Sequence, residues 1–200
     1  MCYPPVVTLG ASEGFSLPMI KPSDVLDFWL KETPRQSWYR TDLALDDQIR
    51  MRFEQSWRQA RRGGLGDWED TAKGALALVI LLDQFSRNMF RGKAEAFATD
   101  ALVRAVADRA LARGFDRDVP EDVRSFFYMP FMHSEDLADQ DKSVALFRAH
   151  SGDPGDGESY AVKHRNTIVR FGRFPARNAA LGRETTQEEI EFLAANPMGF

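Results

Sequence analysis

An almost unbroken apolar run, residues 75–82, continues directly into the polar segment Asp83-Gln84-Phe85-Ser86-Arg87-Asn88. A helix that is apolar on every face is expected in the core of a domain. Its continuation therefore carries charged and amide groups towards surroundings where polar groups are costly unless they are bonded. The chain is thus expected to fold around a helix that ends in a polar site.

The composition is typical of a globular protein. Apolar residues make up 44% of the 200 residues, enough for a sizeable core. The net charge of −4 gives no overall attraction to nucleic acid or to anionic lipid, so neither is expected as a partner. The single cysteine, Cys2, excludes an intrachain disulfide. Neither a signal peptide nor a membrane-spanning run is predicted, and the expected location is cytoplasmic.

Apolar residues recur with a helical period along nearly the whole chain, which predicts an all-α fold. Residues 1–20 are expected to form a flexible arm, and residues 21–200 a single helical domain. Capping residues, glycines and prolines give the bounds of about eight helices. These are about 25–30, 43–62, 69–89, 99–114, 123–133, 134–150, 160–172 and 186–193, with a loop at 151–157. The short connections predict stacked antiparallel pairs.

Three residues give local detail within these helices. Pro130 must kink or end the helix at 123–133, because proline cannot donate a backbone hydrogen bond. Ser134 is the expected N-cap of the next helix. Thr186 and Glu189 have the spacing of a capping box at the start of the last helix.

The first polar segment places Asp83 and Arg87 four residues apart, so these two side chains can form an ion pair along one face of the helix. Gln84 and Asn88 form a neighbouring row. One interpretation is an ion pair where the helix reaches the surface. The other is that Arg87 and Asn88 donate into a cavity while Asp83 holds Arg87 in position.

The second polar segment follows the aromatic stretch 126–131 and contains His133, Glu135 and Asp136. Imidazole titrates near neutral pH and a carboxylate can fix its tautomer, so this group suggests acid–base chemistry. The structural alternative is that Ser134 and the two acids belong to a helix N-terminus. A metal site built from His133, Asp136 and His164 has no diagnostic motif, and no metal or other cofactor is predicted.

The third segment, 159–183, contains no acidic residue. Its cations are Lys163, Arg165, Arg170, Arg173, Arg177 and Arg183. Guanidinium clusters bind carboxylate or phosphate, which predicts an anion site. Alternatively, these cations neutralise segment 116–141, where eight acids and two arginines give a charge of −6, across a helix interface. His164 shares a face with Tyr160 and Ile168, which favours a core histidine over a ligand.

Several blocks resemble the bacterial domain of unknown function 924 family. They are LDQFSRNMFRG (82–92), FYMPFMHSEDLADQ (127–140), HRNTIVRFGRFPARN (164–178), LGRETTQEEIEFL (181–193) and the N-terminal VLDFWL (25–30). The resemblance implies a tetratricopeptide-repeat-like, right-handed helical superhelix and carries no assigned activity. At Ala176 the family pattern usually has histidine. If that histidine were catalytic, this chain would be impaired. If it only lined a pocket, the smaller Ala176 would merely make the pocket wider.

Three functions are compatible with these patterns. The first is binding of a small anionic ligand or a peptide carboxylate in a polar pocket. The second is a hydrolase or transferase in which His133 acts as a base oriented by Glu135 or Asp136. The third is a helical scaffold for a partner protein, which predicts an exposed groove and no enclosed polar pocket. The residues expected to bind the ligand are Asp83, Gln84, Arg87, Asn88, Tyr128, His133, His164, Arg170, Arg173, Arg177 and Asn178, with Phe131 and Phe174 as apolar walls.

Overall fold

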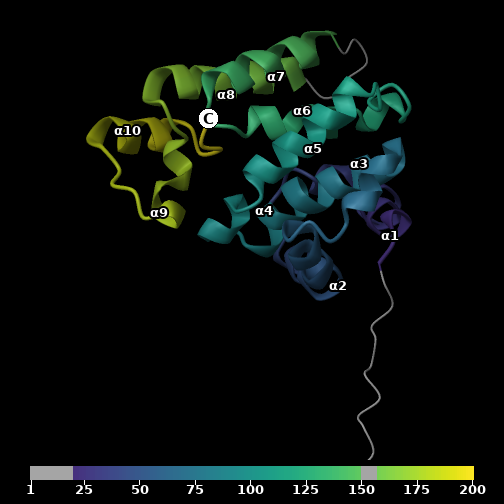
Figure 1. Ribbon diagram of the computed structural model, residues 1–200. Coiled ribbons are helices and arrows are strands. Elements are labelled where there is room, and N and C mark those ends of the chain that lie inside the picture. The colour runs from purple at the N-terminus through teal and green to yellow at the C-terminus, as the bar shows by residue number, and fades with distance from the viewer. Residues whose placement is uncertain (1–19, 150–156) are drawn as a thin grey trace, which may run out of the picture.

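The computed structural model describes residues 20–149 and 157–200, and every regular element within these ranges is a helix (Figure 1). The all-α prediction is therefore confirmed. The arm expected at 1–20 falls, except for Ile20, outside the described residues, and so does the loop expected at 151–157 except for Gly157.

The helices occur in the predicted order along the chain. The first half of the chain contains α1 (Pro22–Asp27), α2 (Leu43–Arg61), α3 (Ala72–Val79), α4 (Ser86–Met89) and α5 (Asp100–Ala112). The second half contains α6 (Ser125–Met132), α7 (Leu137–Ala149), α8 (Gly157–Phe171), α9 (Asn178–Leu181) and α10 (Gln187–Ala195). Two wider π-helical turns follow α1 at Phe28–Glu32 and α3 at Ile80–Phe85.

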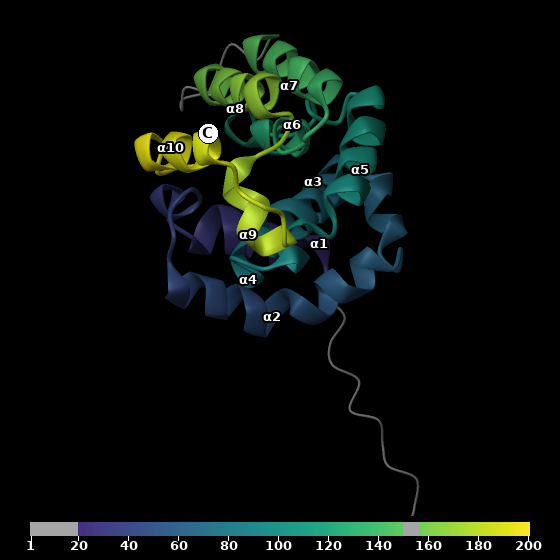
Figure 2. The same cartoon turned by 90° about the vertical axis from the view of Figure 1, so that its left-hand side faces the viewer.

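The core forms around α3, which contacts α1, α5 and α6. Bulky side chains such as Trp29, Phe53, Trp57 and Phe126 are fully buried around it, because only the apolar faces of the surrounding helices turn inward. Consecutive helices α7 and α8 lie side by side above α6 (Figures 1 and 2). The tetratricopeptide-like superhelix remains a prediction.

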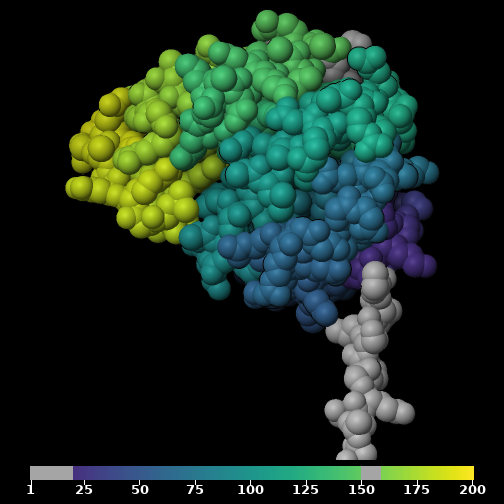
Figure 3. Space-filling view, in the orientation of Figure 1, coloured from purple at the N-terminus to yellow at the C-terminus, as the bar shows by residue number. Residues whose placement is uncertain are grey.

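The C-terminal part of the chain, from about residue 175, packs against the side of the other helices (Figure 3). After α10 the last residues turn back towards α6 and α8 (Figures 1 and 2), where Phe200 stacks on His164 with 3.8 Å between ring centroids. This return brings the C-terminal residues of the chain to the side of α6. Within the described ranges no helix is both long enough and apolar enough to cross a bilayer.

The helix predicted at 69–89 begins only at Ala72 and changes to a π-helical turn part-way along. Gly66–Asp70 form a 3-10 turn, and the hydroxyl of Thr71 caps α3 by accepting a hydrogen bond from the Gly74 amide at 3.1 Å. A Cβ atom at Gly74 would lie 2.1 Å from the carbonyl oxygen of Trp68, so this approach of turn to helix requires glycine. The π-helical turn at Ile80–Phe85 then widens the helix at Asp83, the start of the polar segment.

The predicted helix ends have mixed outcomes. The capping box is confirmed, since Thr186 and Glu189 exchange hydrogen bonds of 2.8 and 3.2 Å. Helix α6 continues through Pro130, which has no N–H to donate to the Phe126 carbonyl, and ends at Met132. The prediction that Ser134 caps the next helix is wrong. Asp136 does so, by accepting a hydrogen bond of 2.8 Å from the Ala138 amide at the start of α7.

Candidate functional site

Asp83 is the centre of the polar segment and is fully buried. Its carboxylate lies 3.0 Å from a guanidinium nitrogen of Arg87, which confirms the predicted pair. It also accepts a hydrogen bond of 2.6 Å from the Gln84 amide and lies 2.9 Å from Nδ1 of His133. Burial raises the pKa of Asp83, but the charge of Arg87 and the hydrogen bonds from His133 and Gln84 outweigh burial and hold this pKa below its usual range. Asp83 is therefore an anion that three neighbours stabilise.

Asp100, at the start of α5, joins two arginines from distant parts of the chain. Its carboxylate lies 3.1 Å from Arg87 and 3.4 Å from Arg177. Arg177 also donates to the backbone carbonyl of His133 at 2.7 Å, and its guanidinium lies 4.5 Å from the ring of Phe174. Burial and the nearby charge of Arg87 lower the pKa of Arg177 to about 10, so it remains protonated at neutral pH. The two guanidinium groups are thus fixed next to each other.

His164 extends this group from α8. Its Nδ1 atom lies 2.8 Å from the backbone carbonyl of Tyr160, and its ring centroid lies 6.2 Å from that of His133. Only 7% of His164 is exposed. Burial, together with the nearby His133, lowers the pKa of His164 to about 3. Burial also lowers the pKa of His133, although the charge of Asp83 opposes this. Both imidazoles are therefore neutral at physiological pH.

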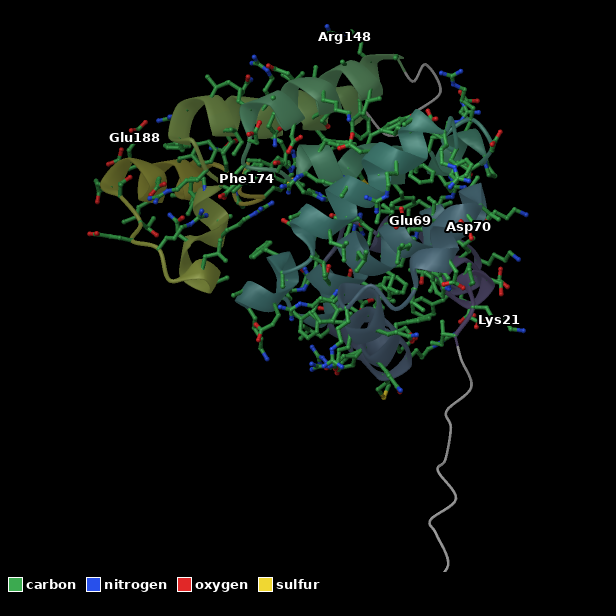
Figure 4. All side chains as sticks on the ribbon, viewed as in Figure 1. Lys21, Glu69, Asp70, Arg148, Phe174 and Glu188 are labelled. Atoms are coloured by element: carbon green, nitrogen blue, oxygen red, sulfur yellow. The ribbon has the colours of Figure 1, made fainter. Side chains whose placement is uncertain are left out.

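These groups surround a cavity of about 670 Å³. Phe174, one of its apolar walls, lies between the C-terminal helices and the core helices (Figure 4). Of the side chains expected to bind a ligand, the lining contains Gln84, Arg87, Asn88, His133, His164 and Arg177. Arg40 and Arg91 add two further cations, and no carboxylate side chain lines the cavity within the described part of the chain. The polar segment therefore borders an open space. Asp83 and Asp100, which do not line the cavity, neutralise part of the positive charge of Arg87 and Arg177.

Several other expected site residues lie elsewhere. Tyr128 donates to Asp116 at 3.0 Å, and burial raises the pKa of its phenol. Arg173 and Asn178 both donate to Glu189. Arg170 pairs with Glu188, which lies at the outer side of α10 in Figure 4. Arg170, Arg173 and Asn178 hold α10 in place, and none of these four side chains lines the cavity.

The expected pairing of His133 with Glu135 or Asp136 is wrong. Glu135 accepts hydrogen bonds from Arg183 at 2.8 Å and from the Phe174 amide at 2.8 Å, while Asp136 caps α7. The carboxylate that orients His133 is Asp83, fifty positions earlier in the chain. This contact forms only because the fold packs α6 against the π-helical turn. Spacing in the sequence could therefore not reveal it.

The two explanations of the basic segment are each true of different residues. Arg165 and Arg183 bind Asp141 and Glu135 of the acidic segment, as the neutralisation hypothesis expected. Of the six cations of this segment, only Arg177 lines the cavity. Asp100, which the sequence did not single out, completes the surroundings together with Arg91, which the buried carboxylate of Asp46 binds at 2.8 Å. Asn88 also donates to Asp46, at 2.8 Å.

A metal site has little support from this geometry. No group of three or more histidine, cysteine, aspartate or glutamate side chains is placed to hold an ion in the described ranges. Arg177 donates to the backbone carbonyl of His133, and Arg87 pairs with Asp83 beside that ring, so these two cations would repel a metal ion.

Residues 25–197 match the model of a family described as a bacterial protein of unknown function (DUF924). The chain belongs to the DUF924 family. A solved structure of a protein of unknown function from Agrobacterium tumefaciens is similar to this DUF924 chain, with a TM-score of 0.82 and 44% sequence identity. The match covers 88% of the present chain and 97% of that one. A comparison with curated proteins finds none that matches.

Ala176 is the position at which the resemblance implied a histidine. The structure places Ala176 in the lining of the cavity. The backbone of Gly199 fills the neighbouring space, and a Cβ atom on Gly199 would lie 2.6 Å from the Cβ atom of Ala176. The small side chain at position 176 therefore leaves room for the returning C-terminal segment.

Proposed function

We propose that the cavity binds a small anionic ligand or a peptide carboxylate. The observation that carries this proposal is the lining itself, which combines four arginines and two histidines with no carboxylate side chain among the described residues. Planar guanidinium groups bind carboxylate and phosphate through paired hydrogen bonds. An anion is the ligand class that such a lining favours.

Arg87 and Arg177 are the groups best placed to bind the anion. Both use their terminal nitrogens to bind Asp100 and backbone carbonyls. Their Nε–H groups have no acceptor in the part of the chain that the structure describes. Because Asp83 and Asp100 already hold the two side chains, a ligand would not have to order them, which lowers the entropic cost of binding.

The test compares two arginines that differ in position. Arg177→Met removes a cavity cation, whereas Arg170→Met removes a cation paired with Glu188 on the outer side of α10. Succinate, inorganic phosphate and N-acetylphenylalanine serve as probes in a thermal-shift titration. We expect at least one of them to raise the melting temperature of the natural chain and of Arg170→Met, but not that of Arg177→Met. Equal responses of the two variants, or no response of the natural chain to any probe, would overturn the proposal.

A second function, acid–base catalysis of a hydrolytic or transfer reaction, is favoured by the contact between Asp83 and His133. A buried carboxylate on Nδ1 orients an imidazole so that Nε2 can accept a proton. No nucleophile has been assigned, so this proposal ranks second. A screen with carboxylate and phosphate esters tests it, and turnover that survives His133→Ala would remove His133 from any catalytic role. The third function, a helical scaffold for a partner protein, stays a prediction.

A further inference from the structure

His133 and His164 are fixed in the same tautomer by two different neighbours. Nδ1 of His133 faces the ionised carboxylate of Asp83, and Nδ1 of His164 faces the backbone carbonyl of Tyr160. A carboxylate and a carbonyl can only accept hydrogen bonds, so each Nδ1 atom must carry the hydrogen. In a neutral imidazole the other nitrogen, Nε2, is then a hydrogen-bond acceptor.

Neither Nε2 atom has a donor among the residues that the structure describes. Both side chains line the cavity, and His164 is more than nine-tenths buried. An acceptor that lines a cavity is open to a donor from a bound molecule or from water. The cavity therefore contains two acceptors in addition to its guanidinium donors.

We infer that the ligand is an anion that also carries hydroxyl or amide hydrogens, which it donates to Nε2 of His133 and His164. This inference rests on the proposed function and narrows its ligand class. Arg87 and Arg177 bind the charged group, and the two imidazoles bind O–H or N–H groups a few atoms away. Hydroxycarboxylates, polyol phosphates and acylated amino acids share this chemistry, whereas plain dicarboxylates and inorganic phosphate at neutral pH offer less of it.

The arrangement of charge argues against a metal ion as the partner of the two Nε2 atoms. Arg177 touches the backbone of His133, and Arg87 touches Asp83 on the other side of that ring. Two fixed cations so close to the imidazoles disfavour a third positive charge, and a structural metal site needs further ligands. A hydrogen-bond donor on an anionic molecule satisfies both the cations and the acceptors.

The experiment uses pairs of probes that differ in a single donor. The pairs are malate and succinate, 2-hydroxypropyl phosphate and propyl phosphate, and N-acetylphenylalanine and 3-phenylpropanoate. Calorimetric titrations of the natural chain at pH 7.5 measure both members of each pair. We expect the donor-bearing member of at least one pair to bind about tenfold more tightly, the factor that one neutral hydrogen bond of about 1.4 kcal/mol produces.

The variants His133→Phe and His164→Phe locate the effect. Phenylalanine keeps an aromatic ring against Phe200 and Phe174 but has no acceptor. In the variant that removes the acceptor of this donor, the ratio of the two affinities should fall towards one, while the member without the donor keeps its affinity; a ratio unchanged in both variants overturns the inference. Equal binding of both members by the natural chain overturns this inference and leaves the proposed function intact. If no member of any pair binds, the proposed function itself fails.

A measurement on the natural chain alone covers the case in which a variant fails to fold. Nitrogen NMR of the imidazoles distinguishes a protonated from an unprotonated Nε2 atom. We expect both Nε2 atoms to be unprotonated at pH 7.5 and to shift when the preferred probe is added. A hydrogen on either Nε2 atom in the free protein overturns the inference.

Discussion

Oδ1 of Asp83 lies 2.9 Å from Nδ1 of His133, and the same carboxylate forms an ion pair with Arg87 at 3.0 Å. One buried anion thus fixes both a cation and an imidazole of the cavity. Removing the charge leaves Arg87 with Asp100 as its remaining carboxylate partner, so Asp83 affects stability and binding together.

The variant Asp83→Asn tests this relationship. We expect the free energy of unfolding to fall by about 3–5 kcal/mol, the usual cost of breaking a buried ion pair from one side. Glu69→Gln, which removes the partner of Arg109 in a more exposed pair, is the matched control and should cost less than about 1 kcal/mol. Urea unfolding followed by circular dichroism measures both. Similar losses in the two variants would show that Asp83 has no special structural role.

Arg173 should behave as a structural residue, unlike Arg177. It donates to both carboxylate oxygens of the buried Glu189 at 2.7 and 2.9 Å and to the carbonyl of Glu184 at 2.9 Å. Arg173→Met therefore should lower the melting temperature, because the capping carboxylate of α10 loses its cation. Anion binding by the folded protein should be unchanged, which calorimetry below the melting temperature checks. Loss of binding without loss of stability would instead place Arg173 in the binding site.

The buried histidines should lower the free energy of unfolding in mild acid. The pKa of His164 is lowered to about 3 in the folded chain, whereas an unfolded histidine titrates near 6.5. Between these values the unfolded state binds the proton and the folded state does not, so stability is complete above about pH 6.5 and falls as the pH decreases. Each such histidine contributes a slope of up to about 1.4 kcal/mol per pH unit.

His164→Leu isolates this contribution. Urea unfolding at pH 6 and pH 5 should show a smaller loss of stability in the variant than in the natural chain, by about 1 kcal/mol. An unchanged pH slope would mean that His164 takes up a proton in the folded protein.

Gly199→Ala should displace the returning C-terminal segment. Gly199 has a φ of +85°, and an added Cβ atom would lie 2.6 Å from that of Ala176. Gly182→Ala is the control, because Gly182 has a φ of +64° but open space around the added atom. Both changes carry the backbone strain of about 1–2 kcal/mol, and only the first carries the clash. Proton NMR of His164, which lies under the ring of Phe200, should change only in Gly199→Ala; equal changes would contradict the close contact.

Sequence patterns determined the helical class and most helix ends, because these depend on neighbours within about four residues. The capping box of Thr186 and Glu189 and the ion pair of Asp83 and Arg87 are both of this kind. Local patterns were less reliable where two caps compete, as Ser134 and Asp136 do before α7. They also placed the start of the third helix too early, since the close approach of Gly74 to Trp68 in the preceding turn is a question of space rather than of period.

The cavity itself was decided by the tertiary structure. Its contacts join residues far apart in the chain, Asp83 with His133 across 50 positions and Asp100 with Arg177 across 77. A sequence shows which charges exist, but the fold decides which of them neutralise each other. Glu135, Glu188 and Glu189 bind Arg183, Arg170 and Arg173, and this leaves Arg177 beside Arg87 at the cavity. The reason is physical: a buried charge is stable only beside the partner that packing brings to it.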